Sequence, residues 1–71
     1  MTTTTTYDVQ GMTCGHCVSA VTEELTALSG VTAVDVDLDA AGTSKVTVTS
    51  EQPLDDDAVR AAVDEAGYQL A

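Results

Sequence analysis

Basic residues are scarce in this chain of 71 residues, which has only Lys45 and Arg60 against twelve acidic side chains. The formal net charge is −10. Because phosphate groups are bound mainly through lysine and arginine, we expect neither nucleic acids nor anionic membrane surfaces as partners. The acidity fits simple solubility. Steering towards a basic docking surface, or adaptation to salt, would give a similar excess, so the composition leaves its cause open.

Aromatic residues are few, and long hydrophobic runs are missing. Tryptophan and phenylalanine are absent, yet 44% of the residues are hydrophobic, which predicts one small domain with an aliphatic core. No window approaches the roughly 18 consecutive apolar residues of a membrane span, so we expect no membrane insertion. Met1 is followed by five threonines, without the basic residues and apolar segment of a signal peptide. We therefore expect a cytoplasmic protein.

Cysteine and histidine are rare as well, and the three residues of these types lie close together. Cys14, His16 and Cys17 all fall within the run GMTCGHC at residues 11–17. In a chain without an export signal, two cysteines are better explained as metal ligands or a redox pair than as a structural disulfide. This run is therefore the candidate functional site.

The Cys-x-x-Cys lies where one hydrophobic periodicity gives way to another. Tyr7 and Val9 alternate as in a strand, and a helical pattern begins directly after the cysteines. The first turn of a helix has unpaired N–H groups and partial positive charge, so a thiolate there is stabilised. The spacing also brings both sulfurs within reach of one ion. Two soft thiolates without an obvious third protein ligand suit Cu(I).

The flanking patterns predict a strand followed by a helix. We expect residues 1–3 to be frayed and a single domain to cover residues 4–71, beginning with a strand through Val9. A helix is expected over residues 15–29, ended by Gly30 as a left-handed residue. Its apolar stripe comprises Val18, Val21, Leu25 and Leu28.

The next segment alternates as two strands joined by a turn at residues 40–42. The first covers residues 31–38, where Val34, Val36 and Leu38 alternate with Asp35, Asp37 and Asp39. The second is centred on Val46 and Val48, and together the two predict an antiparallel hairpin. We interpret the row of carboxylates as a solvated strand face rather than a metal site.

A second helix is expected after Asp55, which is a good N-cap, and before Gly67. Asp56 and Asp57 place negative charge in its first turn, where the helix dipole favours it. Residues 68–71 are long enough only for a short edge strand. The order strand, helix, strand, strand, helix, strand predicts an α+β fold of the ferredoxin-like split βαβ type. Both helices would lie on one face of a four-stranded antiparallel sheet.

The run at residues 11–17, a following helix and the late Ala66-Gly67-Tyr68 together resemble the heavy-metal-associated domain, and within it the bacterial copper chaperones of the CopZ type. The resemblance covers the chain after its threonine run. It implies that Cys14 and Cys17 bind one Cu(I), which is delivered to the metal-binding domain of a copper-transporting P-type ATPase. It also implies a protein that is not an enzyme. We expect a monomer without metal, with a copper-bridged dimer as an alternative.

Four other residues in or near the motif could also affect metal binding. Met12 is interpreted as a core residue rather than a third ligand, and His16 as an exposed bystander, with a role as an occasional ligand as its alternative. Tyr68 is either a half-buried strand residue or, by the resemblance, a neighbour of the metal loop. Thr13 stands where zinc- and cadmium-handling relatives tend to have aspartate, which favours Cu(I).

Other functions remain open. A thioredoxin-like redox enzyme is disfavoured, because no proline stands between the cysteines. A mercury-binding protein, a detached metal-binding domain of a transport ATPase and a copper buffer would share the fold and the motif.

Overall fold

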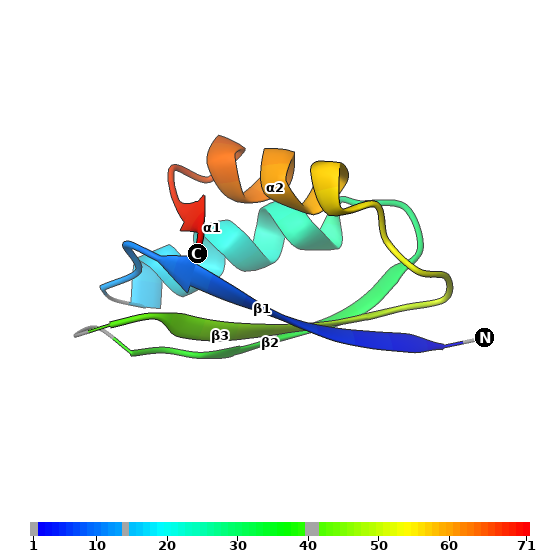
Figure 1. The fold of residues 1–71 in the computed structure, drawn as a ribbon, viewed down its shortest axis with the longest axis horizontal. Helices are drawn as coiled ribbons and strands as arrows, with labels where there is room; N and C mark the ends of the chain where they lie inside the picture. Colours follow the sequence, from blue (N-terminus) through cyan, green and yellow to red (C-terminus); the bar gives the residue numbers. More distant parts are fainter. Residues whose placement is uncertain (1, 14, 40–41) are drawn as a thin grey trace.

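The computed structural model describes residues 2–13, 15–39 and 42–71. It forms one sheet covered on one face by two helices, both of which lie above the sheet in Figure 1. The six elements follow the predicted order: β1 (Thr3–Gln10), α1 (Gly15–Thr26), β2 (Val31–Asp37), β3 (Ser44–Ser50), α2 (Asp56–Glu65) and β4 (Gln69–Leu70). The strand order in the sheet is β2-β3-β1-β4, and the paired neighbours are all antiparallel. The predicted ferredoxin-like fold is therefore confirmed.

The core lies between the sheet and the helices. Alternation along β1 and β3 turns valines inwards, and each helix supplies residues three or four positions apart. The buried hydrophobic residues are Val9, Met12, Cys17, Val21, Leu25, Val46, Val48, Val59, Ala62 and Val63. At roughly 25 cal/mol per Å² of buried apolar surface, this aliphatic core is the main source of stability.

The second helix begins and ends as its sequence predicts. The Asp55 carboxylate accepts a hydrogen bond from the backbone N–H of Asp57 at 3.0 Å, which satisfies one of the unpaired donors of the first turn. Gly67 has a φ of +96°, a conformation that favours glycine. There the Tyr68 N–H donates to the carbonyl of Val63 at 3.0 Å, closing the helix by a Schellman-type bond.

The first helix ends earlier than predicted. α1 stops at Thr26 rather than near Ser29, and Gly30 does not directly terminate it. Instead Gly30, with a φ of +88°, lies in a turn in which the Val31 N–H donates to the Leu28 carbonyl at 3.3 Å. A tight turn with positive φ at this position is a common use of glycine.

The expected stripe of α1 also needs correction. Its fully buried positions are Cys17, Val21 and Leu25, whereas Val18 and Leu28 are only partly buried against the core. Cys17, a predicted ligand, therefore occupies a core position that the sequence pattern assigned to its neighbour Val18.

β2 is an edge strand, and its end differs from the prediction. β2 stops at Asp37, where pairing with Lys45 ends. Leu38 is expected on the buried face with Val34 and Val36, but it follows the last paired residue of this edge strand and is 37% exposed. Asp35, Asp37 and Asp39 are all exposed, as expected for an edge protected by carboxylates.

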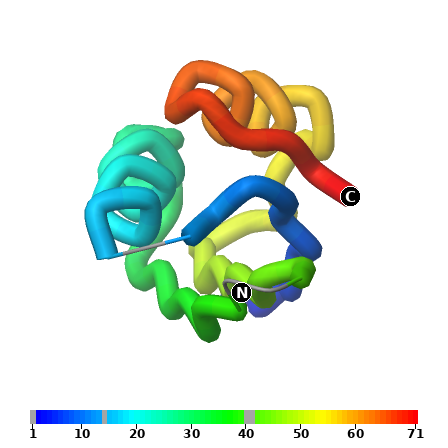
Figure 2. The backbone as a smooth tube through the Cα atoms, turned by 90° about the vertical axis from the view of Figure 1, so that its left-hand side faces the viewer, coloured from blue at the N-terminus to red at the C-terminus, as the bar shows by residue number. Residues whose placement is uncertain are grey.

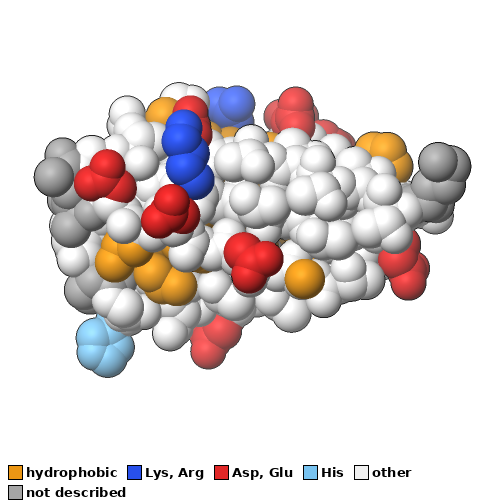
Figure 3. Space-filling model, turned by 90° about the horizontal axis from the view of Figure 1, so that it is seen from below, with side chains coloured by type: hydrophobic (Ala, Val, Ile, Leu, Met, Phe, Trp, Pro, Cys, Tyr) orange, Lys and Arg blue, Asp and Glu red, His pale blue; other side chains and the backbone are white. Residues whose placement is uncertain are grey.

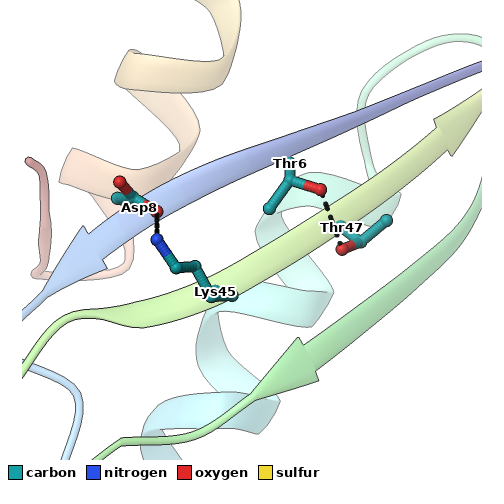
Figure 4. Close-up of polar contacts among 4 residues, drawn as sticks. All are labelled: Thr6, Asp8, Lys45 and Thr47. Carbon is teal, nitrogen blue, oxygen red and sulfur yellow. Dashed lines mark hydrogen bonds and ion pairs between the residues drawn. The ribbon is translucent and has the colours of Figure 1, made fainter.

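The outer face of the sheet carries polar cross-strand pairs. Figure 4 shows Thr6 beside Thr47, with their hydroxyls 3.2 Å apart, and Lys45 in an ion pair with Asp8. Both pairs join residues that face each other in the β1–β3 register. In Figure 3 this open face is mostly white, the colour of the backbone and of side chains that are neither hydrophobic nor charged. An exposed ion pair contributes at most about 1 kcal/mol.

Tyr7 provides a test of the packing between β1 and α2. Burial raises the pKa of its hydroxyl above the ordinary tyrosine value of 10.0, and the negative charge of Asp56 adds to this, whereas a hydrogen bond with Thr5 lowers it. Because the folded pKa exceeds the unfolded one, this contribution to stability is fully present below about pH 10 and is lost as the pH rises through the folded pKa.

We therefore predict that Tyr7→Phe lessens the loss of stability above pH 10. Asp56→Asn should lower the pKa of folded Tyr7 towards its unfolded value and thereby make its part of the alkaline loss smaller. The measurement is the midpoint of urea unfolding as a function of pH. An equally steep alkaline loss in the Tyr7→Phe protein would contradict this account.

Candidate metal centre

The candidate metal site lies at the end of the molecule that faces the viewer in Figure 2. β1 ends there at Gln10, a short loop follows, and α1 begins at Gly15. Of the two predicted ligands, Cys17 is in the first turn of α1 and Cys14 lies outside the described residues. The structure therefore describes one of the two cysteines directly.

Cys17 combines two environments. Its side chain is 8% exposed and belongs to the core cluster, while its backbone is in the helical turn whose N–H groups lack intrahelical acceptors. That first turn contains no acidic residue. The partial positive charge of the helix N-terminus is therefore not offset by a carboxylate on its own first turn. This positive charge favours a thiolate, whereas burial in the apolar core opposes one.

Met12 is buried beneath the loop and is only 1% exposed. It belongs to the same core cluster as Cys17, so the interpretation of Met12 as a core residue is confirmed. A long, flexible thioether fills such a position well. Its burial ties the start of the loop to the core.

Two further residues shape the loop. Gly11 has a φ of +91°, which favours glycine, and a β-carbon placed on it would lie 3.6 Å from Cδ1 of Tyr68. The partly buried ring of Tyr68 thus lies against the start of the loop. This position agrees with the interpretation of Tyr68 as a neighbour of the metal site, and it depends on β4 pairing with Val9 and Gln10.

Thr13 and His16 are both exposed. The Thr13 hydroxyl lies 3.9 Å from Sγ of Cys17, a contact that the sequence analysis did not predict. The pale blue histidine projects into solvent in Figure 3, as expected for a bystander. Among the described residues, no three His, Cys, Asp or Glu side chains gather as a metal site with three such ligands would require.

Comparison with known proteins identifies the family. The heavy-metal-associated domain matches residues 6–69 of the chain. The chain belongs to the heavy-metal-associated domain family. The predicted resemblance is thereby confirmed. The Cys-x-x-Cys motif and the helix that contains Cys17 both lie within the matched domain.

Two kinds of relatives are similar to this chain, a small copper chaperone and a much longer copper-transporting ATPase. The chain is 40% identical to the copper chaperone CopZ of Staphylococcus saprophyticus over 72 residues, covering 94% of this chain and 96% of the relative. It is 38% identical over 64 residues to copper-transporting ATPase 2 of Rhizobium meliloti, covering 90% of this chain but only 7% of the ATPase.

A solved structure supports the same assignment. The CopZ metallochaperone superposes with a TM-score of 0.82 at 30% identity, covering 97% of this chain and all of the other. No helix in the described part of the chain is long and apolar enough to cross a membrane.

Met12→Leu should leave copper affinity nearly unchanged. The replacement conserves volume in the core, where such changes usually cost less than about 1.5 kcal/mol of stability. Met12→Ala, which leaves a cavity, should cost about 2–5 kcal/mol. Affinity is measured by competition with a Cu(I) chelator and stability by urea unfolding. A large loss of affinity in a folded Met12→Leu protein would instead make Met12 a ligand.

Proposed function

We propose that this chain is a copper chaperone. It binds one Cu(I) through Cys14 and Cys17 and passes the ion to the metal-binding domain of a copper-transporting P-type ATPase. The main support is the similarity to a copper chaperone over nearly the full length of both chains. The position of Cys17 on the first turn of α1 adds a physical reason, because soft thiolates select Cu(I). The role of Cys14 rests on its place three residues before Cys17.

The proposed transfer requires no change of oxidation state. A thiolate of the receiving protein forms a bond to Cu(I), and one Cu–S bond to this chain then breaks. A second exchange moves the ion completely, and no electron is transferred. Because each sulfur is replaced in turn, tight binding is compatible with rapid transfer. The chain acts as a carrier in this scheme and performs no covalent chemistry on a substrate.

A metal-binding domain of a transport ATPase is the second candidate. It is favoured by the 38% identity to copper-transporting ATPase 2 over a segment that spans 7% of that protein. Both candidates predict Cu(I) binding by the same cysteines. A cytoplasmic location and a monomer without metal stay predictions. A copper-bridged dimer and mercury binding are the alternatives.

The first test is metal selectivity. Anaerobic titration of the reduced protein should show one Cu(I) per chain, retained in competition with Zn(II). Cys14→Ser and Cys17→Ser should each greatly weaken binding, because a hydroxyl is a hard and mostly protonated ligand. His16→Ala is the matched control between the two cysteines and should bind as the native protein does. Preference for Zn(II) would exclude the Cu(I) assignment.

The second test is transfer. Mixing the copper-loaded chain with an apo metal-binding domain of a copper-transporting ATPase should move copper faster than the ion dissociates into a chelator. We expect this because both proteins hold the ion together during direct exchange, so the ion never enters solvent. Stopped-flow measurement at increasing acceptor concentration should give a rate that rises with concentration. A rate equal to dissociation would identify a copper store rather than a chaperone.

A further inference from the structure

The edge of the sheet beside β1 is open over part of its length. β1 pairs with β3 over residues 3–9, but with β4 only at Val9 and Gln10. On the β4 side, residues 3–7 therefore have no partner strand among the described residues. In Figure 1 this part of β1, in dark blue, extends to the right beyond both helices, at the end of the molecule opposite to the candidate metal site.

One hydrogen bond shows which backbone groups point to this open edge. The Ala71 N–H donates to the Asp8 carbonyl at 2.8 Å, so the backbone groups of Asp8 point away from β3. In an antiparallel sheet, residues two positions apart direct their backbone groups to the same side. Thr4 and Thr6, which alternate in step with Asp8, therefore direct their N–H and C=O groups to the open edge. Each of them offers one donor and one acceptor to another strand.

The side chains around this edge leave it accessible. Thr4, Thr5 and Thr6 are exposed. Thr5 lies on the same face of the sheet as the buried Val9, yet it is exposed, because this part of β1 runs past the helices. Threonine is also a residue that favours the strand conformation. The segment is thus an extended strand that can be approached from its side and from both faces.

The two edges of the sheet differ in their protection against pairing. β2 forms the other edge and carries the exposed carboxylates of Asp35 and Asp37, a common device against pairing between molecules. Residues 3–6 of β1 are all threonine, so this edge has no charge and no proline. In a chain with a net charge of −10, it is a place where a second acidic molecule meets no like charge directly.

The open segment is complementary to itself. When two copies run antiparallel about Thr5, Thr4 of one copy faces Thr6 of the other, and their outward N–H and C=O groups can exchange hydrogen bonds. The threonine side chains then form cross-strand pairs. One such pair exists within the chain, where the hydroxyls of Thr6 and Thr47 lie 3.2 Å apart. The two-fold arrangement closes on itself, and both outer edges of the joined sheet are the protected strand β2.

We propose that residues 3–7 of β1, which we call the threonine edge, pair with the threonine edge of a second copy of this chain in the absence of metal. The contact is small, so we expect a dissociation constant on the order of 1 mM. At low concentration the chain stays the monomer that its sequence predicts. Because the two copies repel each other through their net charge, salt should strengthen the pairing. The proposal does not depend on copper binding.

The test is a nuclear magnetic resonance titration of the reduced, metal-free chain from micromolar to millimolar concentration. The N–H signals of Thr4 and Thr6 should shift with concentration, and their hydrogen exchange should slow. The N–H of Thr5 points to β3 and should shift less. Translational diffusion should fall over the same range, and added salt should move the whole transition to lower concentration.

A proline at position 4 tests the backbone pairing. Thr4→Pro removes an N–H that points outward and leaves the hydrogen bonds between β1 and β3 in place, as is typical of proline on an edge strand. It should weaken the pairing about tenfold, since one hydrogen bond is lost from each copy. Thr4→Val is the matched control, because it keeps the N–H and the β-branched shape, and it should pair as the native chain does. Circular dichroism and urea unfolding verify the fold of both variants.

A chain without cysteine separates this pairing from a copper-bridged dimer. The combined Cys14→Ser and Cys17→Ser variant should pair as the native chain does. Loss of pairing in this variant would show that the cysteines hold the dimer, and the proposal would be wrong. Signals of Thr4 and Thr6 that are independent of concentration, or a dimer that Thr4→Pro leaves intact, would also overturn it. The carrier function is decided separately, by the transfer measurement.

Discussion

Burial of one face of a small sheet beneath two helices is the constraint on which the rest of this structure depends. The core is built largely from valine, leucine and alanine, so its stability comes from many small contacts rather than a few large aromatic ones. Met12 and Cys17 belong to this same core. The metal loop is therefore anchored at both sides by residues whose burial stabilises the fold. The position of one predicted ligand is thus coupled to the packing of the whole domain.

The two helices use their positive N-termini differently. In α2 the Asp55 carboxylate accepts a hydrogen bond from an N–H of the first turn, and Asp56 and Asp57 add negative charge there. α1 has no acidic residue in its first turn and instead places Cys17 there. Because a helix N-terminus stabilises nearby negative charge, this difference leaves the end of α1 suited to a thiolate. The same physical property thus supports folding in one helix and the proposed metal chemistry in the other.

A carrier must release its partner, and the surface described here suits brief contact. The outer face of the sheet is polar, with Lys45 paired to Asp8 and Thr6 beside Thr47. Carboxylates line the exposed edge strand β2, which discourages pairing with a second sheet. Electrostatic attraction mainly raises the rate of encounter rather than the lifetime of a complex.

The sequence by itself determined the order of the elements, the caps of α2 and the place of the Cys-x-x-Cys before the first helix. These features depend on short-range periodicity and on residues with local backbone preferences, such as Asp55 and Gly67. The family resemblance depended on the same local motif, and for Tyr68 it also suggested a place beside the metal loop. The choice of both cysteines as candidate ligands came from their residue type, their spacing and their place before the first helix, and it stays a prediction.

Only the tertiary structure decided how far each residue is buried and which distant residues meet. Cys17 replaces Val18 in the fully buried stripe because helix rotation is set by packing against the sheet, not by sequence pattern alone. Leu38 is exposed because β2 is an edge strand whose pairing ends at Asp37. Tyr68 lies against Gly11 because β4 pairs with the end of β1. Each of these outcomes depends on contacts between segments far apart in the chain, which local periodicity cannot specify.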